Sequence, residues 1–441
     1  MQCDVLIVGA RCAGAALATF LARRGVSVIA VDKSALPSDY VLSTHTVHPS
    51  GMAVLDELGL GAAVRSHSPE MRTCRLDWHG GVLDVAFPEG QGEYCPRRER
   101  FDGLLQDAAR EAGALLLERT TVRALLRDGA RVRGVEVEDR AGQRLTIHAR
   151  IVVGADGRKS RVAHWVGAEE QLGYDAPRGM YWGYFPAPVG WGRTAQYPAG
   201  MYICREAAAT RVAFHTDGDR LLLGALPLPH ELPRFRADPL GALRAVLRDD
   251  PLLREAAHAE PDEAVRGYVG ERYFVRRAAG PGWLLVGDAG IYKDFLSGDG
   301  MSEALIQARG AAHAIAIALG SDEAGADRAL ERFWRSRDVS SVPLFFHAQE
   351  LGALDGAVAL NRAVFRGIAA RPDLRERFAR TFARELSPFE VVGPGFALAC
   401  VLREVVAGTP SALGEFVRRG KRVQGVMRDL AERRRLLAEL T

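Results

Sequence analysis

Cysteine spacing of the kind used in metal sites is missing from this chain of 441 residues. The six cysteines are scattered and contain no Cys-x-x-Cys: they are Cys3, Cys12, Cys74, Cys95, Cys204 and Cys400. This pattern argues against a zinc site and against a disulfide framework, so no metal is expected. It suits a reducing compartment, and we therefore expect a cytoplasmic protein.

Long apolar runs and a strong net charge are missing as well. No run of 18 apolar residues occurs, so no membrane span is expected. The first apolar stretch is interrupted by Asp4, Gly9 and Arg11, which predicts a strand and a turn instead of a secretory signal. The formal net charge of +3 is too small to indicate a nucleic-acid partner. The length favours two or three domains.

The most informative motif that is present is Gly9-Ala10-Arg11-Cys12-Ala13-Gly14. The apolar run 5–8 precedes it, the apolar-periodic segment 15–23 follows it, and a second apolar run then ends in Asp32. The order of strand, tight turn, helix, strand and acid predicts a dinucleotide-binding unit.

Each position of this unit has an expected role. Gly9 allows the turn, and Gly14 lets the helix pack on the strand. The helix N-terminus offers its N–H groups to a pyrophosphate, and Asp32 would hold a ribose hydroxyl. Arg11 replaces the usual middle glycine, and it either adds a cation at the pyrophosphate or points to solvent.

The rest of the chain reads as alternating helical and strand-like segments. Helices are predicted over 13–24, 50–60, 101–112 and 302–319, and strands over 72–87, 115–154, 178–230 and 283–286. Residues 325–441 have a helical pattern with breaks at Pro343, Pro372, Pro388 and Pro394. The basic, leucine-rich end 418–440 fits a membrane-surface helix or a solvated amphipathic helix. Acidic residues interleaved on its polar side favour the solvated helix.

Three motifs stand in a fixed order: residues 9–14, Gly154-Ala155-Asp156-Gly157 and Leu285-Val286-Gly287-Asp288. In this order the chain resembles the single-chain FAD-dependent monooxygenases of the para-hydroxybenzoate hydroxylase type, over residues 1 to about 340. Its Gly-Ala-Arg-Cys-Ala-Gly resembles that of a bacterial subgroup of FAD-dependent oxidoreductases, in which Arg11 is normal.

The resemblance and the order of elements predict an α/β fold, α+β overall. A Rossmann-like FAD-binding domain would comprise residues 1–175 and 275–340, with 72–94 joining the sheet of the second domain. An inserted antiparallel-sheet substrate domain would comprise 176–274. A helical C-terminal region would comprise 341–441.

The resemblance implies FAD as cofactor and NAD(P)H as co-substrate. It puts Asp288 at the ribityl or pyrophosphate end of FAD, Arg98 over the ribityl chain, and Gly300 with Met301 at the pyrimidine edge. The N-terminus of the helix that follows can stabilise negative charge on the reduced ring. The expected cofactor-binding residues are Gly9, Arg11, Cys12, Ala13, Gly14, Asp32, Lys33, Arg98, Asp156, Gly287, Asp288, Gly298, Gly300 and Met301.

Three residues are candidates near the chemistry. His45 lies in Ser43-Thr44-His45-Thr46, a stretch that passes near the isoalloxazine in the family. Trp182 and Tyr184 belong to an aromatic stretch whose counterpart in the family roofs the substrate. Alternating aromatic residues in a strand are ordinarily core, so both roles stay open for Trp182 and Tyr184.

The expected function is monooxygenation of a hydrophobic small molecule, aromatic or polyketide-like as in natural product biosynthesis, with O2, through a flavin C4a-hydroperoxide. A C=C reductase of the geranylgeranyl reductase type is the alternative: residues 181–186 read Tyr-Trp-Gly-Tyr-Phe-Pro, close to the Tyr-x-Trp-x-Phe-Pro of those enzymes. A flavin halogenase is less favoured because Trp-x-Trp is missing. A cofactor-free binding protein is less favoured because the cofactor motifs are intact. The sequence gives no oligomeric state.

Overall fold

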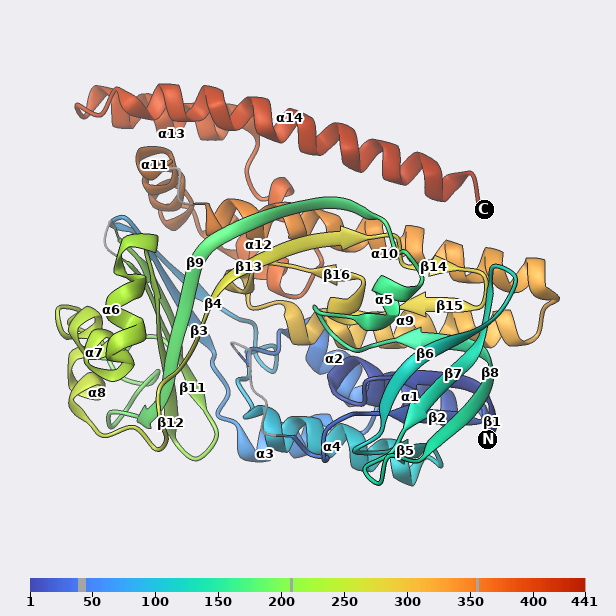
Figure 1. Ribbon diagram of the computed structural model, residues 1–441. Helices are drawn as coiled ribbons and strands as arrows, with labels where there is room; N and C mark the ends of the chain where they lie inside the picture. Colours follow the sequence, from blue (N-terminus) through green and yellow to red (C-terminus); the bar gives the residue numbers. More distant parts are fainter. Residues whose placement is uncertain (39–44, 207–208, 354–356, 441) are drawn as a thin grey trace.

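Two eight-stranded sheets organise the molecule, and helices cover both of them (Figure 1). The computed structural model describes residues 1–38, 45–206, 209–353 and 357–440. Ser43 and Thr44, which belong to the stretch around His45, lie outside the described residues.

The first sheet has a parallel centre in the order β5-β2-β1-β8-β15, with antiparallel additions at β7 and β14. Its strands are β1 (Gln2–Val8), β2 (Val28–Val31), β5 (Leu115–Leu117), β6 (Thr121–Asp128), β7 (Arg131–Glu138), β8 (Arg144–Gly154), β14 (Ala279–Gly280) and β15 (Trp283–Leu285). The central strands read as continuous apolar runs because helices and other strands bury both of their faces.

The second sheet has the order β16-β13-β9-β12-β11-β10-β3-β4. Its strands are β3 (Thr73–Trp78), β4 (Gly81–Ala86), β9 (Glu170–Pro186), β10 (Met201–Arg205), β11 (Ala209–Thr216), β12 (Arg220–Pro227), β13 (Arg266–Arg276) and β16 (Ile291–Tyr292). β9 arches from the first sheet's half of the molecule into the second sheet (Figure 1). Residues 170–180 pair with β13, residues 181 and 182 pair with both β13 and β12, and residues 183–186 pair with β12.

Helices fill the space around both sheets. They are α1 (Cys12–Ala22), α2 (Pro49–Glu57), α3 (Gly61–His67), α4 (Arg98–Glu111), α5 (Arg161–Trp165), α6 (Leu232–Ala237), α7 (Pro239–Arg248), α8 (Arg254–His258), α9 (Gly300–Leu319), α10 (Glu323–Gly352), α11 (Val358–Ala369), α12 (Pro372–Phe382), α13 (Pro394–Val406) and α14 (Ser411–Ala438). Short 3-10 turns are η1 (Pro229–Glu231), η2 (Gly287–Ala289), η3 (Phe295–Ser297) and η4 (Pro388–Glu390).

The packing of these helices separates two cores. α1 packs against α4 and α9 beside the first sheet. Helices α6, α7 and α8 cover one face of the second sheet. Helices α11 and α12 pack on the other face, where α11 contacts β3 and β4 and α12 contacts β4. α14 lies outermost and packs on α10, α11 and α13 (Figure 1). The predicted helices are present with shifts of a few residues at their ends, whereas β9 begins eight residues before the predicted start at 178 and β13 lies outside the predicted strands.

The break expected at Pro343 is wrong, because α10 continues through this residue as one helix. A proline removes one backbone hydrogen bond and crowds the carbonyl four residues earlier. Here α10 packs along α9 and α14, and Val342, Pro343 and Phe345 are buried. This lateral packing offsets the local cost. The other three prolines stand in the first turn of α12, η4 and α13, where a proline loses nothing.

Candidate active site

A cavity of about 530 Å³ lies at the carboxyl ends of β1, β2 and β8, between these strands and the start of α9. We call it the cofactor cavity. All the predicted cofactor-binding residues except Gly14 line it. The two ends of the set are nearly 300 residues apart in sequence, and the parallel sheet brings them to one edge.

The first glycine motif fits its expected geometry. Gly9 has φ +100°, and a Cβ there would come within 2.4 Å of the Ala155 carbonyl oxygen. A Cβ on Gly14 would lie 1.8 Å from the Gly9 carbonyl oxygen, so only glycine allows α1 to pack this closely on β1. Gly14 therefore contributes to the shape of the turn through its contact with Gly9, without lining the cavity itself. Arg11 lines the cavity from the position just before α1.

Asp32 stands at the end of β2 with its carboxylate held in place. One oxygen accepts a hydrogen bond from the Ala10 N–H at 3.0 Å, and the other accepts from the Ser34 N–H at 2.9 Å. These bonds tie the turn of the glycine motif to the next strand. The carboxylate lines the cavity together with Lys33, as a ribose site requires.

The far end of the cavity is formed by η2 and the start of α9. The Gly287 N–H donates to the Gln307 side chain at 2.8 Å, which fixes the turn that carries Asp288. Burial raises the pKa of Asp288 to about 6 despite the nearby Arg98 and Arg158. A Cβ on Gly300 would meet nothing within 4 Å, so this first residue of α9 leaves open space on the cavity side.

These features fit an FAD molecule. Backbone approaches the cavity at Gly9 and Gly300, and the N-termini of α1 and α9, whose first N–H groups have no acceptor within a helix, both line it. The Cys12 thiol is 3.7 Å from the Met301 carbonyl oxygen, so the two helix starts lie against each other. Burial raises the pKa of that thiol above its usual range, and Cys12 is therefore a packing residue.

Arg98 and Asp156, two further predicted cofactor-binding residues, form hydrogen bonds or ion pairs with neighbouring residues. Arg98 lines the cavity and pairs with Asp102 one turn later at 2.9 Å. Asp156 also lines the cavity, but its carboxylate accepts from the Ser160 hydroxyl at 2.5 Å and from the Arg161 N–H at 2.7 Å. These bonds organise the turn before α5. The role of Asp156 toward a cofactor stays a prediction.

The structure brings two of the three predicted catalytic residues together, away from the cavity walls. The Tyr184 hydroxyl lies 2.6 Å from His45 Nε2, and the Arg97 guanidinium sits 4.0 Å from the centre of the Tyr184 ring. Burial lowers the pKa of His45 well below its usual value, and Arg98 and Arg97 lower it further, so the ring is neutral. Trp182 faces the same side of β9, and its indole N–H has no partner among the described residues.

A second cavity, of about 560 Å³, lies beside the cofactor cavity and shares Gly298 with it. We call it the apolar chamber. The second sheet forms one wall, and helices α10 to α14 form the other. Its apolar lining includes Leu76, Trp78, Met201, Ile203, Phe214, Leu344, Leu360, Phe365, Phe378, Phe382 and Phe416. Its size suits a drug-sized organic molecule.

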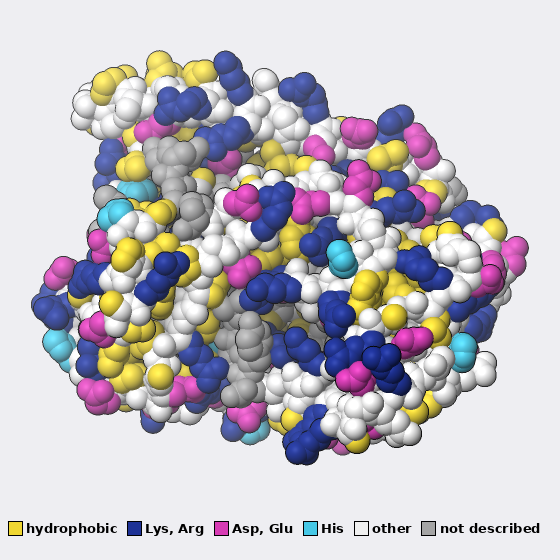
Figure 2. Space-filling model, in the orientation of Figure 1, with side chains coloured by type: hydrophobic (Ala, Val, Ile, Leu, Met, Phe, Trp, Pro, Cys, Tyr) yellow, Lys and Arg dark blue, Asp and Glu magenta, His cyan; other side chains and the backbone are white. Residues whose placement is uncertain are grey.

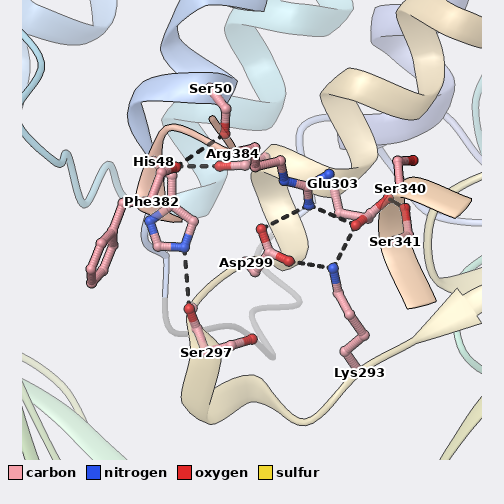
Figure 3. Close-up of polar contacts among 12 residues, drawn as sticks. His48, Ser50, Lys293, Ser297, Asp299, Glu303, Ser340, Ser341, Phe382 and Arg384 are labelled. Atoms are coloured by element: carbon pink, nitrogen blue, oxygen red, sulfur yellow. Dashed lines mark hydrogen bonds and ion pairs between the residues drawn. The ribbon is translucent and has the colours of Figure 1, made fainter. Parts of the chain in front are cut away.

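Four buried charges lie together at the start of α9 (Figure 3), and of these Lys293 and Glu303 line the cofactor cavity and Asp299 lines the apolar chamber. Lys293 contacts both Asp299 and Glu303, and Arg384 reaches the same two carboxylates at 2.8 and 2.6 Å. We call these four residues the charge cluster. Burial favours a raised pKa for both carboxyls, but Arg384 and Lys293 outweigh it and lower the pKa of each. Two cations therefore balance two anions at the start of α9.

His48 forms a second polar anchor on the wall of the apolar chamber. Its Nδ1 donates to the buried Glu93 carboxylate at 2.6 Å. Its Nε2 donates to the Ser297 carbonyl at 3.1 Å, as Figure 3 shows. Burial disfavours a charged ring, yet Glu93 raises the pKa of His48 above its usual value. Both ring nitrogens face acceptors, an arrangement that favours the protonated ring, and these bonds fix the loop leading to Gly298.

The charge cluster and the His48–Glu93 pair were not predicted from the sequence. Arg384 is 81 residues from Glu303, and Glu93 is 45 residues from His48. The only local signal is the run Lys293 to Glu303, which carries four charges among apolar neighbours just before a predicted helix.

Comparisons with known proteins agree with this geometry. Residues 2–182 match the family described as "FAD binding domain". A digeranylgeranylglycerophospholipid reductase of Methanothrix thermoacetophila is 27% identical over 356 residues, which cover 76% of this chain and 83% of that protein.

Two solved structures show the same fold. The flavin-dependent brominase Bmp2 is 17% identical, with a TM-score of 0.73 over 95% of this chain and 100% of that one. PqsL, a probable FAD-dependent monooxygenase from Pseudomonas aeruginosa, is 22% identical, with a TM-score of 0.64 over 87% of this chain and 100% of that one. The predicted fold, a Rossmann-like domain with a second sheet and a helical C-terminal region, is confirmed.

Proposed function

Because the chain is an FAD-dependent oxidoreductase, we propose that it is a monooxygenase that hydroxylates a hydrophobic small molecule. The observation that carries this proposal is the apolar chamber of about 560 Å³, which shares the lining residue Gly298 with the cofactor cavity. The substrate class follows from the lining, which is aliphatic and aromatic over most of its surface.

FAD, when bound, accepts electrons and reacts with O2, and this supplies the oxidising chemistry. The chain's own residues hold and orient it. The glycine motif and Asp32 would hold the adenosine and pyrophosphate end, and Asp288 and Arg98 the ribityl chain. Gly300 and Met301 would lie at the pyrimidine edge, where the N–H groups of α9 stabilise negative charge.

The apolar chamber would keep water away from the cofactor, and the polar residues on its wall would hold the neighbouring loop in place. Its apolar walls would exclude water from the side of the cofactor cavity on which the two cavities share Gly298 as a lining residue. The charge cluster and His48 keep the segment 297–303 in one arrangement, because Lys293, Arg384 and His48 each bond at least one residue of that segment. In this proposal Trp182 and Tyr184 support the sheet that forms the far wall.

The electron donor in this proposal is NAD(P)H, which would reduce the flavin near Arg158 and Asp156. Arg158 lines the cofactor cavity and pairs with Glu271 of β13 at 3.2 Å. Rapid mixing of the oxidised holoenzyme with NADH or NADPH tests the donor, since flavin bleaching reports the reduction directly. Bleaching by neither cofactor would assign the electrons to a separate reductase.

A C=C reductase is the second candidate, and one observation favours it. The relative from Methanothrix thermoacetophila is named as a reductase of a lipid that carries geranylgeranyl chains, and it aligns over 76% of this chain. An unsaturated prenyl chain is also apolar enough for the chamber.

The two candidates differ in what the substrate gains. We would incubate the holoenzyme and NAD(P)H with a panel of hydrophobic phenols and prenyl lipids under ¹⁸O2, and weigh the products. A product that gains one ¹⁸O, formed only with oxygen present, supports the monooxygenase. A product that gains two hydrogens under anaerobic conditions overturns it in favour of the reductase.

A further inference from the structure

Exposed apolar side chains gather on the two helices at the outer edge of the molecule. Among the described residues, six of the twelve exposed large hydrophobic residues lie on α13 and α14: Leu398, Leu402, Val406, Leu413, Val417 and Met427. Val406 is 89% exposed and Val417 is 51% exposed. We call these six residues the α13–α14 face. Single exposed apolar residues need no explanation, but a cluster of this kind marks an interaction surface.

The spacing of these residues puts them on one side of each helix. On α13, Leu398, Leu402 and Val406 are four residues apart and lie on one side of the helix. On α14, Leu413, Val417 and Met427 fall within one arc of the helix. The buried side of α14 is different: it carries Ala412, Glu415, Leu430 and Arg433 toward the body of the protein.

Positive charge surrounds this apolar face. The exposed charged residues of α13 and α14 are seven cations and one acid: Arg403, Arg418, Lys421, Arg422, Arg428, Arg434 and Arg435, with Glu432. Figure 2 shows hydrophobic and basic side chains side by side along the upper left of the molecule, where these helices lie in Figure 1. A second copy of the chain would bring the same cations against one another, which disfavours self-association through this face.

We propose that the α13–α14 face docks on the surface of an anionic phospholipid bilayer. An amphipathic helix with an apolar stripe and a basic polar side lies in the interface plane, with the apolar stripe among the acyl chains and the cations at the headgroups. No helix in the described ranges has the length and apolar character needed to cross a bilayer, so docking leaves the protein on one side of it.

The apolar chamber ends at the same helix. Phe416, Arg419 and Val423 of α14 line the chamber, and Gly420 and Gln424 both line it and are exposed. One side of α14 therefore faces the chamber, and the adjacent side carries the apolar stripe. Docking would bring the chamber wall to the acyl chains, where a hydrophobic substrate is concentrated. This inference concerns location and does not depend on which reaction the flavin performs.

The test is sedimentation of the holoenzyme with vesicles. One set contains equal parts of phosphatidylcholine and phosphatidylglycerol, and the other contains phosphatidylcholine alone. We expect binding to the anionic vesicles that weakens as salt is added, and little binding to the neutral ones. No binding to either set, or equal binding to both, overturns the proposal.

Three variants locate the contact. The double substitution Leu413→Glu and Val417→Glu should lower vesicle affinity at least about ten-fold while the flavin spectrum stays unchanged. The triple substitution Arg418→Gln, Lys421→Gln and Arg428→Gln should lower it about a hundred-fold at low salt. Val189→Glu is the matched control, because Val189 is 96% exposed and lies far along the chain in the β9–β10 connection.

The control variant should bind vesicles like the wild type, and loss of binding in it would overturn the assignment to the α13–α14 face. Light scattering of the same proteins in solution tests whether a second copy of the chain binds to the α13–α14 face instead of a lipid surface. A dimer that Leu413→Glu with Val417→Glu dissociates would assign the face to a second copy of the chain and overturn the lipid proposal.

Discussion

The cofactor cavity and the apolar chamber are of nearly equal size but are built in opposite ways. The cofactor cavity is lined by turns and helix starts, where backbone and glycine positions set the shape. The apolar chamber is lined by side chains from one sheet and five helices. A backbone-lined site depends on a few positions in local motifs. A side-chain-lined site depends on many residues that substitution can change one at a time, so the chamber is the part of the molecule in which substrate choice can vary.

The charge cluster on the wall between the two spaces gives the largest expected effect. Arg384→Met leaves two buried carboxylates facing Lys293 alone, and we expect the free energy of unfolding to fall by about 3–5 kcal/mol. Denaturant unfolding measures it. The control is Arg380→Met, which removes an exposed pair with Glu385 and should cost about 1 kcal/mol or less. Equal losses would show that the cluster contributes no more than a surface pair.

The cluster also has a pH signature. Because the folded pKa values of Asp299 and Glu303 are lowered, their contribution to stability is present above the unfolded values of about 4. It is lost as the pH falls through the folded values. Wild-type protein should therefore lose stability on acidification from pH 5 to pH 3, and Arg384→Met should lose much less. Parallel losses in the two proteins would contradict this assignment.

The cofactor cavity is tested next by Asp288→Ala. Removing one charged hydrogen-bond partner costs about 1.5–3 kcal/mol, which is about a ten- to hundred-fold loss of FAD affinity. The variant should fold and purify with little flavin, and Asp373→Ala, in an exposed pair with Arg371, should keep it. Because the pKa of Asp288 is about 6, wild-type affinity should drop below pH 6, and the variant should lack this drop. Full flavin retention on dilution would refute the placement of Asp288.

A substitution in the apolar chamber should change the KM for substrate and leave FAD binding unchanged. Val423→Phe narrows the chamber from α14, and we expect the KM for a turned-over hydrophobic substrate to rise about ten-fold with unchanged flavin content. Val417→Phe adds the same bulk to the outward side of the same helix and should leave KM unchanged. If both variants behave alike in steady-state assays, the chamber is not the substrate site.

The smallest effect is expected at Arg11. If its side chain faces the pyrophosphate, Arg11→Ala should weaken FAD binding about two- to five-fold, and added salt should reduce the difference. Arg11→Gly restores the common motif and should bind more tightly than Arg11→Ala. Titration of the apoproteins with FAD measures all three. Identical affinities would mean that the side chain makes no contribution.

The contrast between the two cavities also explains what the sequence could predict. Gly9, Gly14, Asp32 and the segment 287–301 are constrained within short stretches, so their spacing indicated both the fold and the cofactor cavity. The partners of Asp299 and Glu303 could not be predicted in this way. Arg384 follows α12, and only the packing of α12 against the rest of the chain brings it to the start of α9.

Residues on β9 illustrate the limit within one strand. The alternation of residues 180–185 predicted that Trp182 and Tyr184 share a face, and they do, opposite Tyr181 and Phe185. The pattern could not indicate that His45 lies against Tyr184 or that helices from the last hundred residues cover this face. Their roles toward a ligand remain predictions.

The length of β9 has a mechanical consequence. This strand of 17 residues runs without interruption from one half of the molecule to the other, hydrogen-bonded to β13 over most of its length. Rotating one half against the other would bend a two-stranded ribbon. Such bending would strain the β9–β13 hydrogen bonds, so this ribbon resists the rotation, and the wall of the chamber that lies outside the sheets is the helical one, α10 to α14. The rate at which substrate enters the chamber and product leaves it would then be limited by movement of these helices, and not by rotation of one half of the molecule against the other.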